Sequence, residues 1–190
     1  MNSDLTGRAD KLLEADDLAC IEMIEEAIGE HDYERAAELT SNRLAHPNID
    51  TACQSGAILR FRLACLLIDI ASATLSKDEA TRGLAILENE RPSLERFIAK
   101  PSYEYDLGNG KHSLFKMLRS DTGFQHSPDT LGLLVEAKDH YWRSFKLIED
   151  GQPGHAAELK VNLATVLSES GRVAEAIRLY DEVLDVTPGF

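Results

Sequence analysis

The C-terminal segment, residues 158–190, has the pattern of two amphipathic helices joined by a tight turn. Apolar residues recur there at steps of three and four, which places them on one side of each helix. Gly171 suits a left-handed turn at the end of the first helix, and Pro188 cannot continue the second. Such a hairpin cannot bury its apolar side alone, so this segment requires similar units beside it. The residues expected on its buried faces are Leu163, Leu167, Val173, Ile177, Tyr180 and Leu184.

The spacing of this segment recurs upstream. A large apolar residue is followed by Ala thirteen positions later and by Pro twelve positions after that, and the first interval occurs a third time near the N-terminus. Recurrence at a fixed spacing predicts an array of helical hairpins. The matching residues are Leu163, Ala176 and Pro188 in the last unit, Leu67, Ala80 and Pro92 before it, and Met23 and Ala36 nearest the N-terminus.

A further unit is split by additional residues. Leu107 and Gly108 have the pattern of a first helix, and Ala137 and Tyr141 that of its partner, but Leu107 and Ala137 are thirty positions apart. Residues 111–118 extend the first helix, which leaves residues 119–129 as a predicted surface loop. Long loops are often functional, yet insertions also cost little free energy, so both interpretations of this segment remain.

The residues in these positions resemble the tetratricopeptide repeat (TPR) family, most closely over residues 158–190. The resemblance implies an all-α fold of antiparallel helix hairpins, stacked as a right-handed α-solenoid of about four irregular repeats. We therefore expect a single domain over residues 1–190. Its repeats are expected near residues 16–47, 57–92, 102–150 and 157–190. The chain departs from the family pattern at Lys160, Ala164 and Leu167. The residues that match the pattern are Leu163, Ala176, Tyr180 and Pro188, with Gly171 at the turn.

Helical periodicity predicts nine helices, and no segment has the alternation of a strand. Pro92 either ends the helix before it or begins a short extra turn. The expected helices span residues 5–14, 16–29, 32–45, 51–75, 78–98, 102–118, 130–149, 154–169 and 173–186.

In the TPR family, the first helices of successive repeats line a concave groove that holds a partner peptide. Asn162 stands where the family's groove asparagine stands, and Asn109 occupies a second groove-facing place. An asparagine amide both donates and accepts hydrogen bonds, as a peptide unit does. The alternative is that both asparagines only cap or bridge helices. The resemblance implies that the neighbouring groove residues are Tyr105, Asp106, Val161 and Thr165.

These features favour a module that binds a partner protein or peptide and serves as an adaptor or scaffold. An alternative function is the sensor part of a larger effector, because the segments YDLGNG and 162–190 resemble bacterial TPR proteins, some of which carry nuclease domains. Self-association through the last repeat is a further candidate interaction, since terminal repeats need a polar outer face. A stand-alone enzyme is the least supported function.

The net charge of −13 is unevenly distributed, with 13 acidic and 4 basic side chains in residues 1–50. Such an excess favours a basic partner, or it forms a solvated surface that keeps the protein soluble. Nucleic acid is not an expected partner, because neutralising phosphates requires clustered Lys and Arg. The most apolar stretch, residues 56–75, contains Arg60, Arg62 and Asp69, so it is expected to be a buried helix and not a membrane span.

No catalytic or metal-binding pattern is complete in the sequence, so we expect no enzyme activity, metal or cofactor. Residues 108–113 lack the earlier Gly, the Ser or Thr and the preceding strand of a phosphate-binding loop. Arg119 and His126 have the spacing of a helical ribonuclease pair, but they fall in the predicted loop. The six histidines are scattered and are expected to be satisfied at the surface or its boundary. Reduced, core-like cysteines at positions 20, 53 and 65 suggest a cytoplasmic protein.

Overall fold

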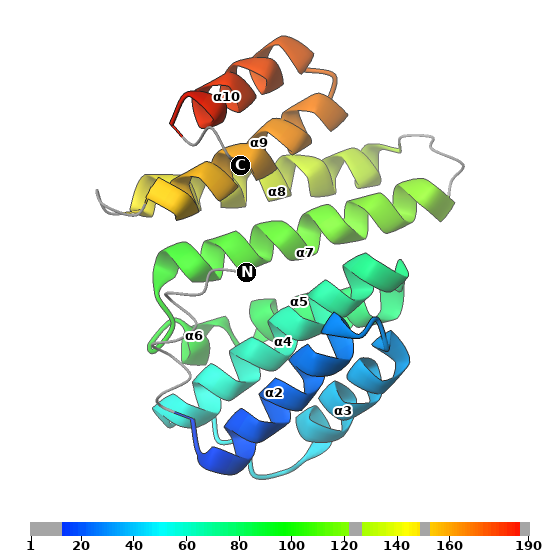
Figure 1. Cartoon of the computed structure of the whole chain (residues 1–190), viewed down its shortest axis with the longest axis vertical. Helices are drawn as coiled ribbons and strands as arrows, with labels where there is room; N and C mark the ends of the chain where they lie inside the picture. The colour runs from blue at the N-terminus through cyan, green and yellow to red at the C-terminus, as the bar shows by residue number, and fades with distance from the viewer. Residues whose placement is uncertain (1–12, 122–126, 149–152, 187–190) are drawn as a thin grey trace. The chain divides into compact units, whose positions relative to one another are not determined.

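The computed structural model describes residues 13–121, 127–148 and 153–186, and within these ranges all regular secondary structure is helical (Figure 1). The prediction of an all-α fold is confirmed. The helix expected over residues 5–14 lies almost entirely outside the described residues. The helices are α2 (Ala15–Gly29), α3 (Tyr33–Ala45), α4 (Gln54–Thr74), α5 (Lys77–Asn89), α6 (Arg91–Leu94), α7 (Lys100–Asp121), α8 (Pro128–Leu147), α9 (Pro153–Glu169) and α10 (Val173–Val186).

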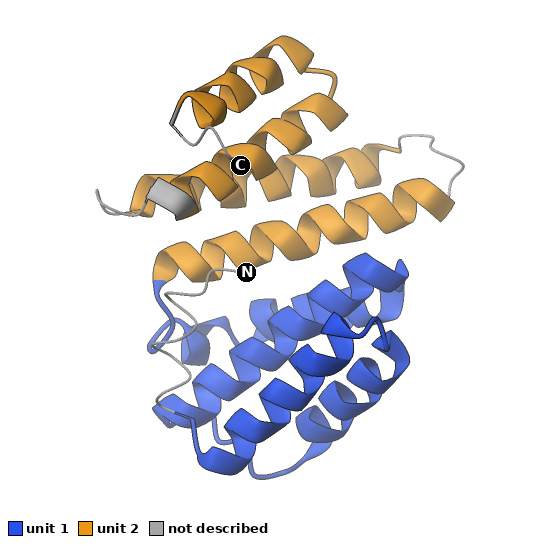
Figure 2. Ribbon diagram, viewed as in Figure 1, with its two compact units in different colours: residues 1–99 blue, residues 100–190 orange. Residues whose placement is uncertain are grey.

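The helices form two compact units, residues 1–99 and residues 100–190 (Figure 2). In unit 1, α2 packs with α3 and α4 packs with α5, while α4 also contacts α2 and α3. In unit 2, α7 packs with α8 and α9 packs with α10, while α8 contacts α9. Each unit therefore contains two helical pairs, and the boundary between the units falls between the second and third predicted repeats.

Three of the helical pairs share one turn geometry. In each, a residue one or two positions past the end of the first helix has a positive φ, with values of 62° at His31, 58° at Leu75 and 81° at Gly171. The next backbone N–H then donates to a carbonyl five residues earlier, as in a Schellman turn. The prediction that Gly171 ends its helix in a left-handed conformation is confirmed. The three closing bonds join Asp32 to Ala27 (2.8 Å), Ser76 to Ala71 (3.2 Å) and Arg172 to Leu167 (2.8 Å).

Small residues allow the paired helices to approach closely. The alanines of the recurring spacing, Ala36, Ala80 and Ala176, are all buried. In α7, a Cβ placed on Gly108 would lie 2.7 Å from the ring of Tyr141 on α8, too close for any side chain. Since helix axes separate according to the side chains at their contact, these positions set the spacing within each pair.

Each unit has its own apolar core. In unit 1, α4 is buried along most of its length, as its sequence predicts, and its arginines are paired with carboxylates. Arg60 contacts Glu90 at 2.7 Å, and Arg62 contacts Glu25 at 2.6 Å. No helix in the described residues is both long enough and apolar enough to cross a membrane. The main cores comprise Ile21, Ile24, Leu59, Leu63, Leu66 and Ile70 in unit 1 and Phe115, Leu134, Tyr141, Leu159, Leu163 and Val166 in unit 2.

The expected packing of α10 is wrong. Val173, Ile177 and Leu184 are 51%, 53% and 54% exposed. The buried side chains of α10 are instead Ala176 and Val183. These lie about a quarter turn around the helix from the exposed stripe, since successive residues are ~100° apart. The periodicity identified an apolar face correctly, but only the position of α9 determines which face is covered.

The predicted loop over residues 119–129 is also shorter than expected. Helix α7 continues through Asp121, and α8 begins at Pro128. Ser127 caps α8 by accepting a hydrogen bond from the Thr130 N–H at 3.1 Å, so both flanks of the segment belong to helices. Residues 122–126 lie outside the described residues, and so does His126, which has the ribonuclease spacing with Arg119.

The structure also decides the positions expected for Pro92, Cys53 and Met23. Pro92 lies in α6, so it begins a short extra turn, which was one of the two alternatives. Cys53 is exposed and caps α4, where its sulfur accepts from the Gly56 N–H, whereas a core-like position was expected. Met23, the apolar residue of the first predicted repeat, is 44% exposed, and the adjacent Ile24 is buried in its place.

The packing of α10 leads to a stability test. We expect Leu163→Ala to lower the free energy of unfolding by about 2–5 kcal/mol, because it opens a cavity in the core of unit 2. Ile177→Ala should change it by less than about 0.5 kcal/mol, because that side chain is exposed. Urea denaturation followed by circular dichroism measures both. A loss of stability in Ile177→Ala comparable to that of Leu163→Ala would show that the stripe is covered.

Candidate binding surface

Helices α7 and α9 of unit 2 present a connected set of polar side chains, which we call the polar surface. Hydrogen bonds join Tyr105 to Glu158 and to Asn162, and His112 to Glu169. Both sets of partners advance along the chain in the same direction, so α7 and α9 run parallel, and α8 runs antiparallel to both (Figure 1). The first helices of two successive predicted repeats are thereby linked by polar side chains.

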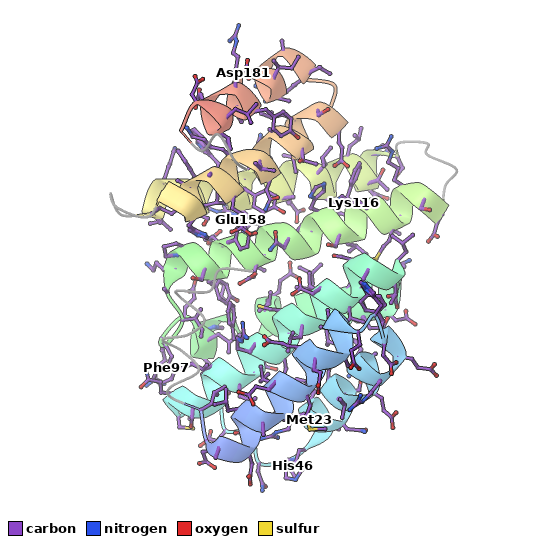
Figure 3. All side chains as sticks on the ribbon, in the orientation of Figure 1. Met23, His46, Phe97, Lys116, Glu158 and Asp181 are labelled. Atoms are coloured by element: carbon purple, nitrogen blue, oxygen red, sulfur yellow. The ribbon has the colours of Figure 1, made fainter. Side chains whose placement is uncertain are left out.

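Tyr105 is the centre of this surface. Its hydroxyl donates to Glu158 Oε1 at 2.5 Å and accepts from Asn162 Nδ2 at 3.2 Å, and Figure 3 shows Glu158 on the side of α9 that faces α7. Burial raises the pKa of Tyr105, and the hydrogen bond to Glu158 raises it further, because both favour the neutral phenol. The phenol therefore stays a hydrogen-bond donor through the physiological pH range.

Glu158 is held in its ionised form. Its Oε2 lies 3.9 Å from His155 Nδ1, and the imidazole and the Tyr105 hydroxyl together lower the pKa of this carboxyl against the opposing effect of burial. His155 also contacts Tyr105 edge to face, with ring centroids 5.4 Å apart. These three side chains fix the geometry at the start of α9.

Asn109 lies one turn along α7 from Tyr105 and faces α8. Its Oδ1 accepts a hydrogen bond from the buried Tyr141 hydroxyl at 2.9 Å, and its Nδ2 lies 3.5 Å from Asp106 Oδ1, a weak contact. Burial raises the pKa of Tyr141 as well, so this phenol also remains a donor. Four of the groove residues expected from sequence, Tyr105, Asp106, Asn109 and Asn162, are thus brought together.

Val161 and Thr165 lie at the other side of the polar surface. Thr165 Oγ1 donates to the Val161 carbonyl at 2.9 Å and lies 3.0 Å from the Tyr180 hydroxyl on α10. Both residues are half-buried. Thr165 therefore ties α9 to α10, whereas Asn162 ties α9 to α7, although both asparagine amides and Thr165 were expected on one groove.

Three histidines are buried, whereas a surface or boundary position was expected. His112 Nε2 lies 2.5 Å from Glu169 Oε2, which extends the polar surface towards the end of α9. Burial opposes ionisation of Glu169, but the His112 hydrogen bond and the nearby positive charges outweigh it and lower the pKa. The contact between His112 and Glu169 could have been predicted from the sequence. His112 follows Tyr105 by seven residues and Glu169 follows Asn162 by seven, so each pair lies on one helical face.

A second buried polar group joins α7 to α8. Glu104 Oε2 lies 2.7 Å from His140 Nδ1 and accepts from Arg143 Nε at 2.8 Å. Burial lowers the pKa of His140; burial also opposes ionisation of Glu104, yet the hydrogen bonds from His140 and Arg143 lower the pKa of that carboxyl. Because its members satisfy one another across the helix contact, we interpret this group as structural.

The described residues contain no group of three or more His, Cys, Asp or Glu side chains arranged to hold a metal ion. No protein-family model matches the chain, and a search of curated proteins found no match.

The lowered pKa of Glu158 leads to a test at acid pH. A carboxyl with a lowered folded-state pKa contributes stability that is present above its unfolded pKa of about 4.3 and is lost as the pH falls through the folded value. We therefore expect the free energy of unfolding to fall less between pH 7 and acid pH in Glu158→Gln than in the wild type. Urea denaturation at both pH values measures this difference.

The matched control is Glu38→Gln, which changes an exposed glutamate of α3. It should keep the acid dependence of the wild type. Equal acid dependence in Glu158→Gln and the wild type would contradict the contacts assigned to Glu158.

Proposed function

We propose that the protein is a helical-repeat module of the TPR type that binds a partner protein or peptide on its polar surface, with Asn109 and Asn162 as the principal contacts. The observation that carries this proposal is the hydrogen-bonded row on α7 and α9, which holds two half-buried asparagine amides at the surface of adjacent first helices. In this role the protein is an adaptor or scaffold and performs no chemistry of its own.

The shared turn supports the repeat interpretation. His31, Leu75 and Gly171 occupy the same position relative to the recurring spacing, since each follows its apolar residue, Met23, Leu67 or Leu163, by eight positions. Three pairs that agree in both spacing and turn are expected of repeats of one unit, which cannot bury its apolar face alone. A right-handed solenoid of four such units remains part of the proposal.

The unused hydrogen-bonding capacity of the two asparagines supports the binding role. An amide side chain offers two donor hydrogens and an acceptor oxygen with two lone pairs. Asn162 uses one donor, towards Tyr105, and keeps its oxygen and its second N–H. Asn109 uses its oxygen for Tyr141 and turns its Nδ2 towards Asp106 and Tyr105, so the lone pair left on its oxygen is its main free capacity. Each amide can therefore bond a peptide unit while its internal hydrogen bond stays in place.

The internal bonds also lower the cost of binding. Immobilising a free side chain at an interface costs about 0.5–1.5 kcal/mol, and a side chain already held by its neighbours avoids most of that loss. Tyr105 holds Asn162, and Tyr141 holds Asn109. The bridging role and the binding role of the asparagines are thus compatible, and only a binding measurement separates them.

A binding experiment tests the proposal. Peptides selected against the full chain from a phage-displayed random library are measured by isothermal titration calorimetry. We expect Asn109→Ala/Asn162→Ala to weaken binding by about thirtyfold, because each of the two neutral hydrogen bonds is worth ~1 kcal/mol. Unchanged affinity in the double variant would remove both asparagines from the binding site.

Tyr141→Phe is the matched control for that experiment. It removes the hydroxyl that holds Asn109 but keeps both asparagine amides. If the amides contact the peptide directly, this variant retains most of the affinity. A loss as large as that of the double alanine variant would instead mean that the asparagines act only by bridging helices.

A second candidate function is that of a sensor or scaffold part within a larger assembly, and the exposed stripe of α10 favours it. Val173, Ile177 and Leu184 form an apolar row that suits a further helix, either from an attached effector or from a second copy of the chain. The acidic Asp181 beside this row, labelled in Figure 3, favours a basic flank on the partner helix.

Self-association through α10 is directly measurable. If the stripe joins two copies, sedimentation velocity should show a mass that rises with protein concentration, and Ile177→Glu should keep the protein monomeric by placing a charge in the contact. Because Ile177 is exposed, the substitution should leave the fold intact. A wild-type chain that stays monomeric at high concentration would rule out this use of the stripe.

A further inference from the structure

Unit 2 contains a groove on a different face from the polar surface. The groove lies between α8 and α10, with α9 as its floor, and has a volume of about 460 Å³. This volume falls in the range of small-molecule sites, ~300–1,000 Å³. Its lining residues are Lys138, Asp139, Trp142, Leu163, Leu167, Arg172, Glu175, Arg178, Leu179 and Glu182.

The inner surface of the groove is apolar. Leu163 and Leu167 of α9 and Leu179 of α10 form its floor and one side. Trp142 of α8 forms the other side and is 46% exposed, so the groove leaves a large aromatic ring open to solvent. The indole is held in place by Phe145, whose ring stacks on it at a centroid distance of 5.6 Å and an interplanar angle of 13°. A rigid, exposed aromatic wall suits an apolar ligand, because no ordering of the ring is needed on binding.

The rim of the groove is charged, and its carboxylates are paired. Glu175 bonds Arg172 through both oxygens at 2.5 and 2.6 Å. The other two rim carboxylates, Asp139 and Glu182, pair with Lys138 at 3.2 Å and with Lys160 at 2.8 Å. These pairs compensate every negative charge that lines the groove.

Arg178 is the remaining rim cation. It is exposed, and within the described part of the chain no ion pair or hydrogen bond to it is seen, although its charge contributes to the lowered pKa of Glu175. Because Lys160, outside the groove, pairs with Glu182, Arg178 is the lining cation that remains for a ligand. A planar guanidinium matches a carboxylate with two parallel hydrogen bonds.

We propose that this groove binds a small amphiphilic carboxylate, whose apolar body packs on Leu163, Leu167 and Trp142 and whose carboxylate pairs with Arg178. The three-sided enclosure and the volume favour a small molecule over a helix, which is ~10 Å across. The site is separate from the polar surface and gives the module a ligand-responsive face.

The chain has a single tryptophan, Trp142, so its fluorescence reports directly on the groove. Decanoate, kept below its micelle-forming concentration, is titrated into the full-length protein. Decanol and decyltrimethylammonium, which have the same chain but a neutral or a positive head group, are titrated in parallel. We expect decanoate to give a saturable blue shift of the emission, at concentrations at least about tenfold lower than the other two amphiphiles require, since a charge-assisted hydrogen bond exceeds ~1.4 kcal/mol.

The variant Arg178→Gln tests the head-group contact. It should weaken decanoate by about tenfold while leaving decanol unchanged, and Arg178→Lys should restore part of the loss. Arg35→Gln, at an exposed arginine of unit 1, is the matched control and should bind decanoate as the wild type does. Because Arg178 is exposed, the Gln variant is expected to fold normally.

Amide chemical shifts in a ¹⁵N–¹H spectrum locate the ligand independently. Decanoate should move the signals of Leu163, Leu167 and Leu179 and leave those of Asn109 and of the helices of unit 1 in place. The proposal is overturned if the three amphiphiles bind equally, if Arg178→Gln binds decanoate normally, if the fluorescence change does not saturate, or if the shifts fall elsewhere. Peptide binding at the polar surface is measured separately, so failure of either site leaves the other result interpretable.

Discussion

Close contact between antiparallel helices, made possible by small residues, is the interaction on which both units depend. A Cβ on Gly83 of α5 would lie 2.8 Å from the Ala64 carbonyl of α4, and one on Gly108 would meet the Tyr141 ring. At such distances the large side chains on either side of the contact interlock, and the pair becomes a rigid element. A turn with one left-handed residue then closes three of these pairs in the same way. The side chains of the polar surface and of the groove are held in place by these helical pairs.

Helix α9 separates the two surfaces of unit 2. Asn162 and Leu163 are adjacent in sequence but point about 100° apart around the helix, so one faces α7 and the other faces the groove. On the side that faces α7, Tyr105 bonds Glu158 and also holds Asn162. On the other side, Leu163 and Leu167 line the groove together with Trp142 and Arg178. A single helix thereby supports a polar surface suited to a peptide and an apolar groove suited to an amphiphile.

Much of the secondary structure was predictable, and the reasons differ from element to element. Helix α4 was predictable because its apolar residues run all around it, and the end of α9 because Gly171 suits a left-handed turn. The equivalent turn at Leu75 gave no such signal, since leucine rarely adopts a positive φ, and His31 gave only a weak one, because histidine adopts a positive φ far less often than glycine. In the polar surface, Asn109, Asn162, Tyr105 and Asp106 were identified through a resemblance. Their partners Glu158 and Tyr141 were missed, because a hydrogen bond between residues 32 or 53 positions apart leaves no local pattern.

The sequence by itself determined the helical class, the positions of most helices, the recurring small residues and the apolar faces, because these follow from local periodicity and backbone preference. The tertiary structure alone decided which apolar face is buried. Ile177 and Val183 lie on the same helix and are equally apolar, yet the position of α9 covers Val183 and leaves Ile177 exposed. The tertiary structure also decided which charges are paired: Arg172 bonds Glu175, whereas no ion pair is seen for Arg178 in the described part of the chain. Both outcomes depend on which helices become neighbours in space, and that information is spread over the whole chain and not held in any one segment.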